Sequence, residues 1–276
     1  MRIREYREGD VEDLVRAHGA VGGEADHLRW YYLENPRVDL DLVYVAEVAG
    51  RARSTARIVP LEVYVDGNVV PVGGIATVAT HPAYRRRGLA GVLTRHALNE
   101  LRERGTHLSL LHPFAHAFYR SCGFELATEG IEYALKPTNR PTSPEQGRMR
   151  NYVPADLSPM MALQDEQVAS HPCCVRRSEG WWRLALDLEG EKAADYGHQA
   201  AVYETDGRLE GYVLYKYAER REDRAPRRTL RVSELVARRP AAGCSLSSPR
   251  KIPATSRSGT RPPEQSPCIR TWGTLT

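Results

Sequence analysis

The feature that most constrains this chain is a strand–turn–helix junction at residues 79–103. The segment "ATHPAYRRRGLAGVLTRHALNE" opens with a short β-like stretch that ends at Pro82, and three arginines and Gly88 follow. Beyond Gly88, apolar residues recur at helical spacing, with Arg and Glu on the other face: Leu89, Val92, Leu93, Ala97, Leu98 and Leu101. The pattern predicts a helix over residues 88–103 that begins at the arginine–glycine turn.

The start of this helix is predicted to bind an anion. Its first N–H groups have no partner within the helix, and the helix dipole places partial positive charge there. Gly88 lets a ligand approach the backbone, Ala90 is small, and Arg85 and Arg86 can donate paired hydrogen bonds to phosphate oxygens. We therefore expect a pyrophosphate site, although RRRG alone would suit an arginine run that caps a surface helix. The chain contains neither GxxxxGK[ST] nor GxGxxG, which disfavours nucleotide hydrolysis and dinucleotide binding.

The residues around the junction predict a mixed α/β domain over 1–137. Helical patterns cover 11–19, 26–35 and 115–124, and residues rich in Val, Ile, Tyr and Thr predict strands at 40–50, 52–67, 73–82, 106–113 and 131–137. The linker "PTNRPTSPEQGRM" marks a boundary at about 138–149.

The second region, residues 150–237, repeats the opening of the first. "MRNYVPADLSPMMALQDEQ" is similar to "MRIREYREGDVEDLVRAHG": a strand, an acidic residue and a helix. A further helix, "SEGWWRLALDL", and three strands at 199–207, 209–219 and 229–237 follow, with Trp181 and Trp182 interpreted as core residues. We expect a partial second lobe of related fold.

Residues 238–276 break the pattern, being rich in Ser, Thr, Pro and Arg without periodicity. They could form a disordered basic tail or be non-native sequence read out of frame; the abrupt change favours the second interpretation. They hold seven basic residues and one acidic residue, and without them the net charge of +4 becomes −2. Whole-chain basicity therefore gives no argument for nucleic acid as a partner.

Composition excludes several other classes. Five cysteines without a CxxC pair predict neither a disulfide framework nor a metal site. No apolar run reaches the length of a membrane span, and the charged N-terminus "MRIREYREGD" is unlike a signal peptide. The expected location is the cytoplasm, with reduced thiols.

With "AFYRSCGF" downstream, "VATHPAYRRRGLA" resembles the GCN5-related N-acetyltransferase (GNAT) superfamily, in which Q/R-x-x-G-x-G/A binds acetyl-CoA. More narrowly, residues 1 to about 237 are similar to the Eis-type (enhanced intracellular survival) acetyltransferases. The resemblance implies a GNAT fold, a mixed and mostly antiparallel sheet with a splayed central strand, followed by a partial second GNAT-like lobe. It also implies direct acetyl transfer without a covalent enzyme intermediate.

The family's roles carry over residue by residue. The resemblance places Arg85, Arg86, Gly88 and Ala90 on the pyrophosphate loop, and Val78 and Thr80 on the strand that pairs with the pantetheine arm. It makes Tyr119 the general acid that protonates the departing thiolate, which suits a phenol that is neutral at pH 7. A packed tyrosine with a solvated hydroxyl is the alternative for Tyr119.

The amine acceptor and its base are less defined. In GNAT folds the segment between the first two helices borders the acceptor, which here gives Glu24, Asp26 and Trp30. Carboxylates and an indole would suit a cationic polyamine. The alternative is a solvated acidic turn beside a core tryptophan. His112 and His116 are candidate bases by pKa and position. The resemblance implies that the base is the C-terminal carboxylate of a third domain, a domain that we do not expect in this sequence.

The expected function is acetyl-CoA-dependent N-acetylation of a primary amine, either a small aminoglycoside- or polyamine-like molecule or a protein lysine, without metal. The alternative is a truncated, non-catalytic chain that binds acyl-CoA. Family members form hexamers through surfaces that include the third domain, so the resemblance leaves homo-oligomer formation by this chain open.

Overall fold

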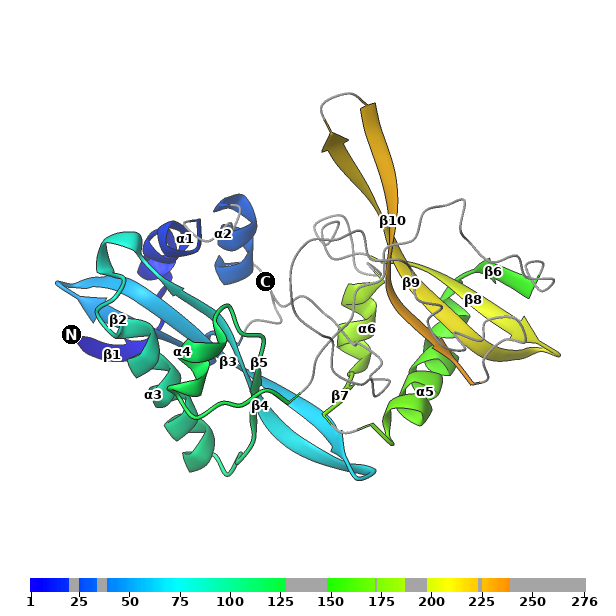
Figure 1. Ribbon diagram of the computed structural model, residues 1–276, viewed down its shortest axis with the longest axis horizontal. Helices are drawn as coiled ribbons and strands as arrows, with labels where there is room; N and C mark the ends of the chain where they lie inside the picture. The colour runs from blue at the N-terminus through cyan, green and yellow to red at the C-terminus, as the bar shows by residue number, and fades with distance from the viewer. Residues whose placement is uncertain are drawn as a thin grey trace, which may run out of the picture. The chain divides into compact units, whose positions relative to one another are not determined.

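The computed structural model describes residues 1–19, 25–33, 39–127, 148–171, 173–186, 198–222 and 225–238. The chain divides into two compact units, and the first contains residues 1–63 and 69–127. Its sheet has the order β1-β2-β3-β4-β5, in which β1 pairs antiparallel with β2, β2 antiparallel with β3, and β4 parallel with β5 (Figure 1). The strands are β1 (Arg2–Glu5), β2 (Val43–Val48), β3 (Arg51–Val65), β4 (Asn68–Thr80) and β5 (Ser109–Leu111).

Helices cover both faces of the first sheet. Helices α1 (Val11–Gly19) and α2 (Ala25–Leu33) lie on one face, and α3 (Leu89–Glu103) and α4 (His116–Arg120) lie on the other (Figure 1). The stripe of α3 that the sequence predicted is buried against the sheet, in a core of Leu42, Tyr44, Ala46, Ala56, Ile58, Ile75, Leu89, Leu93, Ala97 and Leu101. Gly73 permits the close approach, because a Cβ there would lie 2.2 Å from Leu101 Cδ1.

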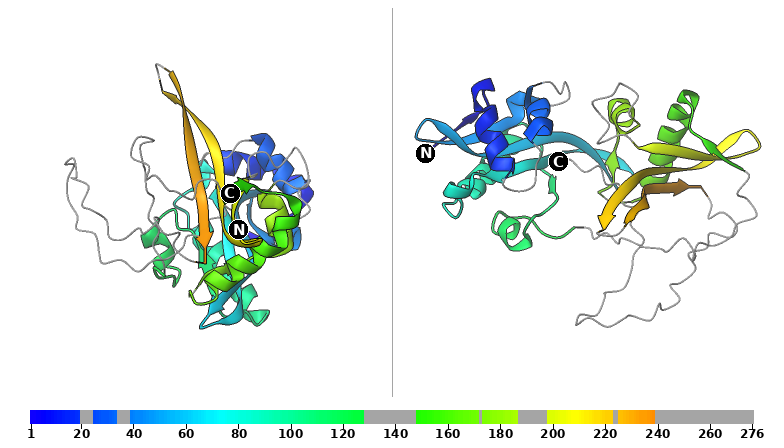
Figure 2. Two further views of the ribbon diagram at one scale, coloured as in Figure 1. Left: turned by 90° about the vertical axis from the view of Figure 1, so that its right-hand side faces the viewer. Right: turned by 90° about the horizontal axis from the view of Figure 1, so that it is seen from above.

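The second unit is built around a sheet of order β10-β9-β8-β6. Its strands are β6 (Met149–Asn151), β8 (Gln199–Thr205), β9 (Arg208–Glu222) and β10 (Ala225–Ala237), and its helices are α5 (Leu157–Val168) and α6 (Glu179–Ala185). The two helices pack on one face of the sheet, over Val202, Tyr212, Leu214 and Val236 (Figure 2). The two-residue strand β7 (Val175–Arg176) was not predicted.

The tip of the β3–β4 hairpin, Tyr64–Asn68, groups with the second unit. There the Tyr64 N–H donates to the Cys174 carbonyl at 3.0 Å, and the Cys173 N–H donates to the Tyr64 carbonyl at 2.9 Å. The Tyr64 hydroxyl donates to Asp165 at 2.9 Å. The long β3–β4 hairpin therefore belongs to the first unit along most of its length and to the second unit at its tip.

The two units share one ion-pair arrangement, which confirms the internal repeat. In the first, Arg4 donates two hydrogen bonds to Asp10, at 2.6 and 2.8 Å, and one to Glu47 at 2.6 Å. In the second, Arg150 donates to Asp156 at 2.7 and 2.8 Å and to Glu204 at 3.0 Å. Each arginine fastens the first strand of its sheet to the turn before the first helix and to the next strand.

A second ion pair lies inside the second unit. The Arg177 and Glu234 side chains, 3% and 2% exposed, form paired hydrogen bonds, one of them 3.0 Å long. The Tyr212 hydroxyl also donates to Glu234. Arg177 lies 4.0 Å from the ring centre of Trp181 and 5.1 Å from that of Trp182. The core role predicted for Trp182, 1% exposed, is confirmed, and Trp181 packs against the same core.

The mixed α/β fold with two related lobes is confirmed. The predicted strand at 131–137, linker residues 138–147 and the tail beyond Arg238 lie outside the described residues, so the proposed domain limits and the reading-frame interpretation stay predictions. In the described part of the chain, no helix is long and apolar enough to cross a bilayer.

Candidate functional site

The helix start at Gly88 has the geometry of an anion site. Gly88 precedes α3 in the left-handed region, at φ 78°, and no side chain caps the helix. A Cβ at Gly88 would meet nothing within 4 Å, so the space beside this backbone is open. The side chains of Arg85, Arg86 and Arg87 are exposed, and Arg86 itself has φ 60°. Because the first amides of α3 have no side-chain acceptor, a bound phosphate would satisfy them.

The turn before Gly88 is ordered by an aromatic ring. Tyr84 lies between two guanidinium groups, with Arg53 at 4.7 Å and Arg87 at 4.9 Å from its ring centre. Arg85 Nε donates to the Thr80 carbonyl at 3.2 Å. Arg87 is thus held on the ring and Arg85 on the strand end, which fixes the path of the backbone between them.

Strand β4 separates from β5 before reaching this turn. The parallel pairing runs from Gly73–Ser109 to Ile75–Leu111, whereas β4 continues to Thr80. Thr77, in the part of β4 that β5 does not pair with, lies in the left-handed region at φ 49°. Among the described strands none pairs with β4 beyond Ile75 on this side, so the backbone at Val78 is available to an extended ligand.

The predicted strand residues differ in their contacts. Val78 is half-buried against the core beneath α3. The Thr80 hydroxyl lies 2.8 Å from that of Ser54, which also donates to the Ala79 carbonyl at 2.8 Å. Thr80 is therefore tied to β3, and the end of β4 is rigid where the turn begins.

Tyr119 lies in an aromatic cluster on α4. It is 4% exposed, with ring centres of Phe114, Phe118 and Phe124 at 5.1, 4.9 and 6.0 Å. Burial, with a smaller contribution from Cys122, raises the pKa of Tyr119 to about 12. The phenol therefore keeps its proton at neutral pH, as a general acid must.

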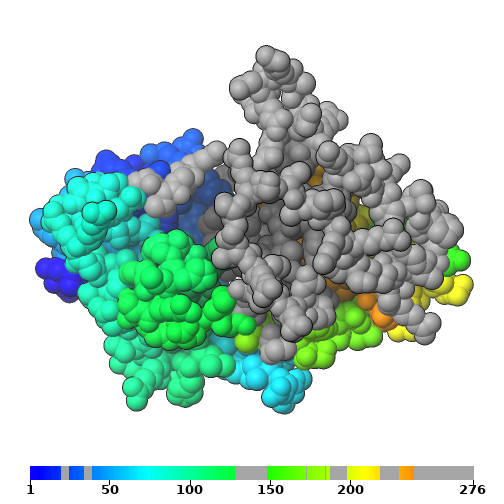
Figure 3. Space-filling model, viewed as in Figure 1, coloured from blue at the N-terminus to red at the C-terminus, as the bar shows by residue number. Residues whose placement is uncertain are grey.

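Helix α4 packs on the first turns of α3. A Cβ at Gly91 would lie 3.9 Å from Phe118 Cε2, and the green surface around residues 110–125 adjoins the blue-green surface around residues 85–105 (Figure 3). The structure thus brings the helix that carries Tyr119 beside the helix that begins at Gly88. Ala90, the small residue expected near the phosphates, is half-buried in the first turn of α3.

The predicted acceptor residues lie in different surroundings. Glu24 is outside the described residues. Asp26 is fully exposed and accepts a hydrogen bond from Arg29 at 2.9 Å. Trp30 packs against the core between the sheet and helices α1 and α2, 5.8 Å from the His27 ring. His112 and His116 are exposed.

A buried polar cluster beneath α1 and α2 was not predicted from the sequence. His18 Nε2 lies 3.0 Å from the Tyr32 hydroxyl, and burial lowers the pKa of His18 to about 4. The hydroxyls of Thr55 and Thr77 are also buried, with no hydrogen-bond partner within the described part of the chain. Arg57, 5% exposed, donates to the neighbouring Tyr31 hydroxyl. The arginines in "RARSTARI" could have predicted this cluster. A charged residue on a core strand needs a specific partner, and so Arg57 indicates polar groups nearby.

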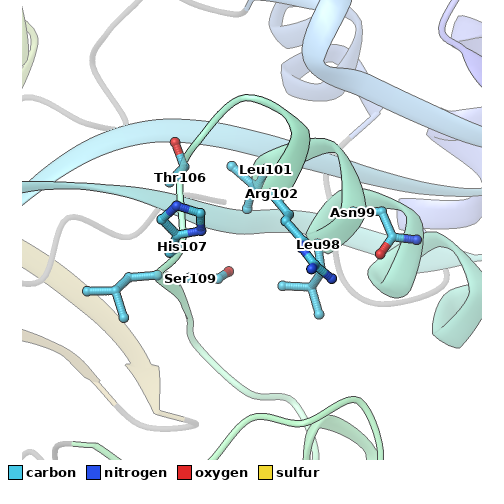
Figure 4. A pocket seen from close by; sticks show the side chains of 8 residues that line it. Leu98, Asn99, Leu101, Arg102, Thr106, His107 and Ser109 are labelled. Carbon is cyan, nitrogen blue, oxygen red and sulfur yellow. The ribbon is translucent and has the colours of Figure 1, made fainter.

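Two hollows lie apart from this site. One, of about 280 Å³, lies at the opposite end of α3 from Gly88, between Leu98, Arg102, His107 and Ser109 (Figure 4). The other, of about 360 Å³, lies in the second unit beside Tyr152, His198 and Tyr215. Among the described residues no three His, Cys, Asp or Glu side chains form a metal-binding group.

Comparisons with known proteins agree with this geometry. The chain is 31% identical to an uncharacterized N-acetyltransferase of Streptomyces avermitilis over 65% of this chain and 46% of the relative. It is 29% identical to an uncharacterized N-acetyltransferase of Streptomyces coelicolor over 74% and 51%. The chain thus spans about half the length of the curated relatives that it matches.

Solved structures show the same fold. A probable N-acyltransferase from Enterococcus faecalis has a TM-score of 0.67 at 22% identity, covering 88% of this chain and 60% of that one. Eis1 from Mycobacterium abscessus has a TM-score of 0.61 at 23% identity, covering 88% and 61%. Models of the acetyltransferase (GNAT) domain match residues 2–127 and 173–248. The two matches together span most of the chain, which therefore belongs to the GCN5-related N-acetyltransferase (GNAT) superfamily.

Proposed function

We propose that this chain is an N-acetyltransferase that transfers acetyl directly from acetyl-CoA to a primary amine. The observation that carries the proposal is the combination of a strand that leaves its partner after Ile75 and an open helix start at Gly88, joined by an ordered turn. This geometry would accept an extended ligand along β4 whose anionic end meets the first amides of α3.

Each residue then has a defined task. The amides after Gly88, with Arg85 and Arg86, bind the pyrophosphate, and Ala90 leaves room for it. The backbone of Val78 and Thr80 pairs with the amide-containing arm and orients the acetyl carbonyl. The bound cosubstrate supplies an activated thioester. The amine attacks the thioester carbonyl directly, so no covalent enzyme intermediate forms; Tyr119 donates its proton to the departing sulfur, and the proton that the amine nitrogen loses restores the phenol by way of water.

The acceptor that the family resemblance implies is a primary amine on a small polyamine- or aminoglycoside-like molecule, or on a protein lysine. Trp30 packs against the core, so it would offer the acceptor the apolar face of its ring. Asp26, already paired with Arg29, has weaker support as a cation site.

The experiment is a calorimetric titration of the full chain with acetyl-CoA, followed by measurement of CoA release with spermidine, kanamycin and a lysine peptide. We expect binding and amine-dependent release. Binding without release with any of the three amines would favour the alternative, an acyl-CoA-binding chain without transfer. No binding would refute the proposed site.

Two variants test the roles separately. Tyr119→Phe should lower kcat by about 10²–10⁴-fold, the range for losing a general acid, with acetyl-CoA affinity unchanged because the ring remains packed. Arg85→Ala with Arg86→Ala should weaken acetyl-CoA binding, and unchanged affinity would contradict the pyrophosphate assignment.

A further inference from the structure

A fourth arginine lies beside the arginine–glycine turn. Arg53 belongs to β3, and its carbonyl accepts a hydrogen bond from the His81 N–H at 2.8 Å, at the point where β4 gives way to the turn. Its guanidinium carbon lies 4.7 Å from the ring centre of Tyr84. Arg53 is part of neither the pyrophosphate loop nor the strand that would bind the thioester arm, so its task is not yet assigned.

Arg53 differs from the other two arginines of β3. Arg51 Nε donates to Asp13 at 3.1 Å, and Arg57 donates to the Tyr31 hydroxyl. Arg53 forms no ion pair with a described residue, and its Nε is buried without a hydrogen-bond partner in the same part of the chain. Because a cation that is partly withdrawn from water is costly without a polar partner, an anionic ligand would complete this site.

Tyr84 holds Arg53 together with Arg87. The guanidinium carbon of Arg87 lies 4.9 Å from the same ring centre, so both cations are fixed next to one ring. Stacking uses the flat face of a guanidinium and leaves the terminal N–H groups at its edge able to donate. The ring therefore restricts both side chains before a ligand binds, which reduces the entropy lost on binding.

The positive charge at the turn exceeds what a pyrophosphate needs. Residues 67–99 contain no aspartate or glutamate. Arg85 and Arg86 can balance the single negative charge on each phosphate of the pyrophosphate, which leaves the charges of Arg53 and Arg87. A phosphate monoester carries about two negative charges at neutral pH. Coenzyme A has one such group, the 3′-phosphate of its ribose.

The order of groups along acetyl-CoA places this phosphate beyond the pyrophosphate. In the proposed function the thioester arm lies along β4 and the pyrophosphate lies on the first amides of α3. The ribose then continues past the turn, away from the arm. Arg53 and Arg87 lie at this turn and can donate charge-assisted hydrogen bonds to a phosphate there.

We propose that Arg53 and Arg87 bind the 3′-phosphate of the cosubstrate, and that this chain thereby selects acetyl-CoA over acetyl-dephospho-CoA, which lacks that phosphate. The inference rests on the proposed function, because it needs the pyrophosphate at Gly88. Arg53 and Arg87 are then binding residues, and Tyr84 is the positioning residue that holds them.

The test is a calorimetric titration of the full chain with acetyl-CoA and with acetyl-dephospho-CoA at physiological ionic strength. The wild type should bind acetyl-CoA at least about tenfold more tightly, the change expected when a charged group loses its hydrogen bonds. Arg53→Met and Arg87→Met should each reduce this preference to less than about threefold. Their affinity for acetyl-dephospho-CoA should stay within about twofold of that of the wild type, because the other contacts are kept.

Two controls separate these roles from a general loss of charge or of structure. Arg51→Met removes the same charge two residues away, and it should keep the preference of the wild type because Asp13 already neutralises Arg51. Tyr84→Leu should lose the preference, and Tyr84→Phe should keep it because the ring is retained.

The wild type alone can overturn the proposal. If it binds both cosubstrates equally, the 3′-phosphate has no site here, while the proposed transferase function stands. If it binds neither, the pyrophosphate site is wrong and this inference fails with it. A preference that persists in both Arg53→Met and Arg87→Met, with folding checked by circular dichroism, would place the 3′-phosphate on other residues.

Discussion

Histidine 18 makes the stability of the first lobe depend on pH in a calculable way. Its side chain is buried next to the Tyr32 hydroxyl, and burial lowers its pKa to about 4, against about 6.5 in an unfolded chain. Because the folded pKa is the lower one, the neutral form is favoured by folding. The resulting stability is complete above pH 6.5 and is lost as the pH falls from 6.5 toward 4.

The size of the effect follows from the two pKa values. Between about pH 6.5 and pH 4 the unfolded chain binds about one more proton at this histidine than the folded chain does, which lowers the unfolding free energy by about 1.4 kcal/mol per pH unit. Between pH 7.5 and pH 5 this histidine alone should therefore lower the unfolding free energy by about 2 kcal/mol. That is a large share of the stability of an ordinary domain.

Urea unfolding of the wild type and of His18→Gln, at pH 7.5, 6.0 and 5.0, isolates this contribution. Glutamine cannot titrate, so the unfolding free energy of the variant should fall by about 2 kcal/mol less than that of the wild type between pH 7.5 and pH 5. The contributions of the other titratable groups are the same in both proteins and cancel in this difference. His107→Gln, on an exposed residue, should behave as the wild type does. Parallel losses in wild type and His18→Gln, or a His18 NMR signal that titrates near pH 6.5, would refute the reasoning.

Three further predictions concern the turn, its aromatic support and the second core. Gly88→Ala should weaken acetyl-CoA binding about tenfold by straining a left-handed residue at the ligand, whereas Gly50→Ala, at φ 74° with equally open space, should lower stability by about 1 kcal/mol and leave affinity unchanged in calorimetry. Tyr84→Leu should raise KM for acetyl-CoA several-fold without changing kcat, and Tyr84→Phe should not, because the ring face that holds Arg87 is kept. Glu234→Ala should cost about 3–5 kcal/mol in urea unfolding by leaving Arg177 buried without its carboxylate, and Arg177→Met with Glu234→Leu should recover most of the loss; equal losses would contradict this.

Local patterns predicted the elements of this fold well. The apolar spacing after Gly88 predicted α3, and Asp10 followed by an amphipathic run predicted α1 with its observed limits. Strand β5 is shorter than the predicted 106–113, because its pairing with β4 covers only Ser109–Leu111, and before it the Leu108 carbonyl accepts a single hydrogen bond from the Gly73 N–H. A two-residue strand such as β7 has no periodicity to detect.

The candidate site was predictable only where its residues are adjacent in sequence. Arg85, Arg86 and Gly88 belong to one turn, so their spacing indicates their joint role. The placement of Tyr84 between Arg53 and Arg87 depends on the register between β3 and the end of β4. Likewise, the His18–Tyr32 contact joins two helices, and no sequence pattern specifies it.

The ion-pair arrangement that the two lobes share bears on how they are related. Arg4 with Asp10 and Glu47, and Arg150 with Asp156 and Glu204, make the same bonds in two lobes of one chain, as a duplicated ancestral gene would leave them. The His81 N–H donates to the Arg53 carbonyl as the Arg238 N–H donates to the Glu210 carbonyl, so Thr77, four residues before His81, corresponds to Glu234, which lies in a closed ion pair. The two lobes thus share the arginine with its two carboxylate partners but differ at this position, where the second lobe holds a buried ion pair.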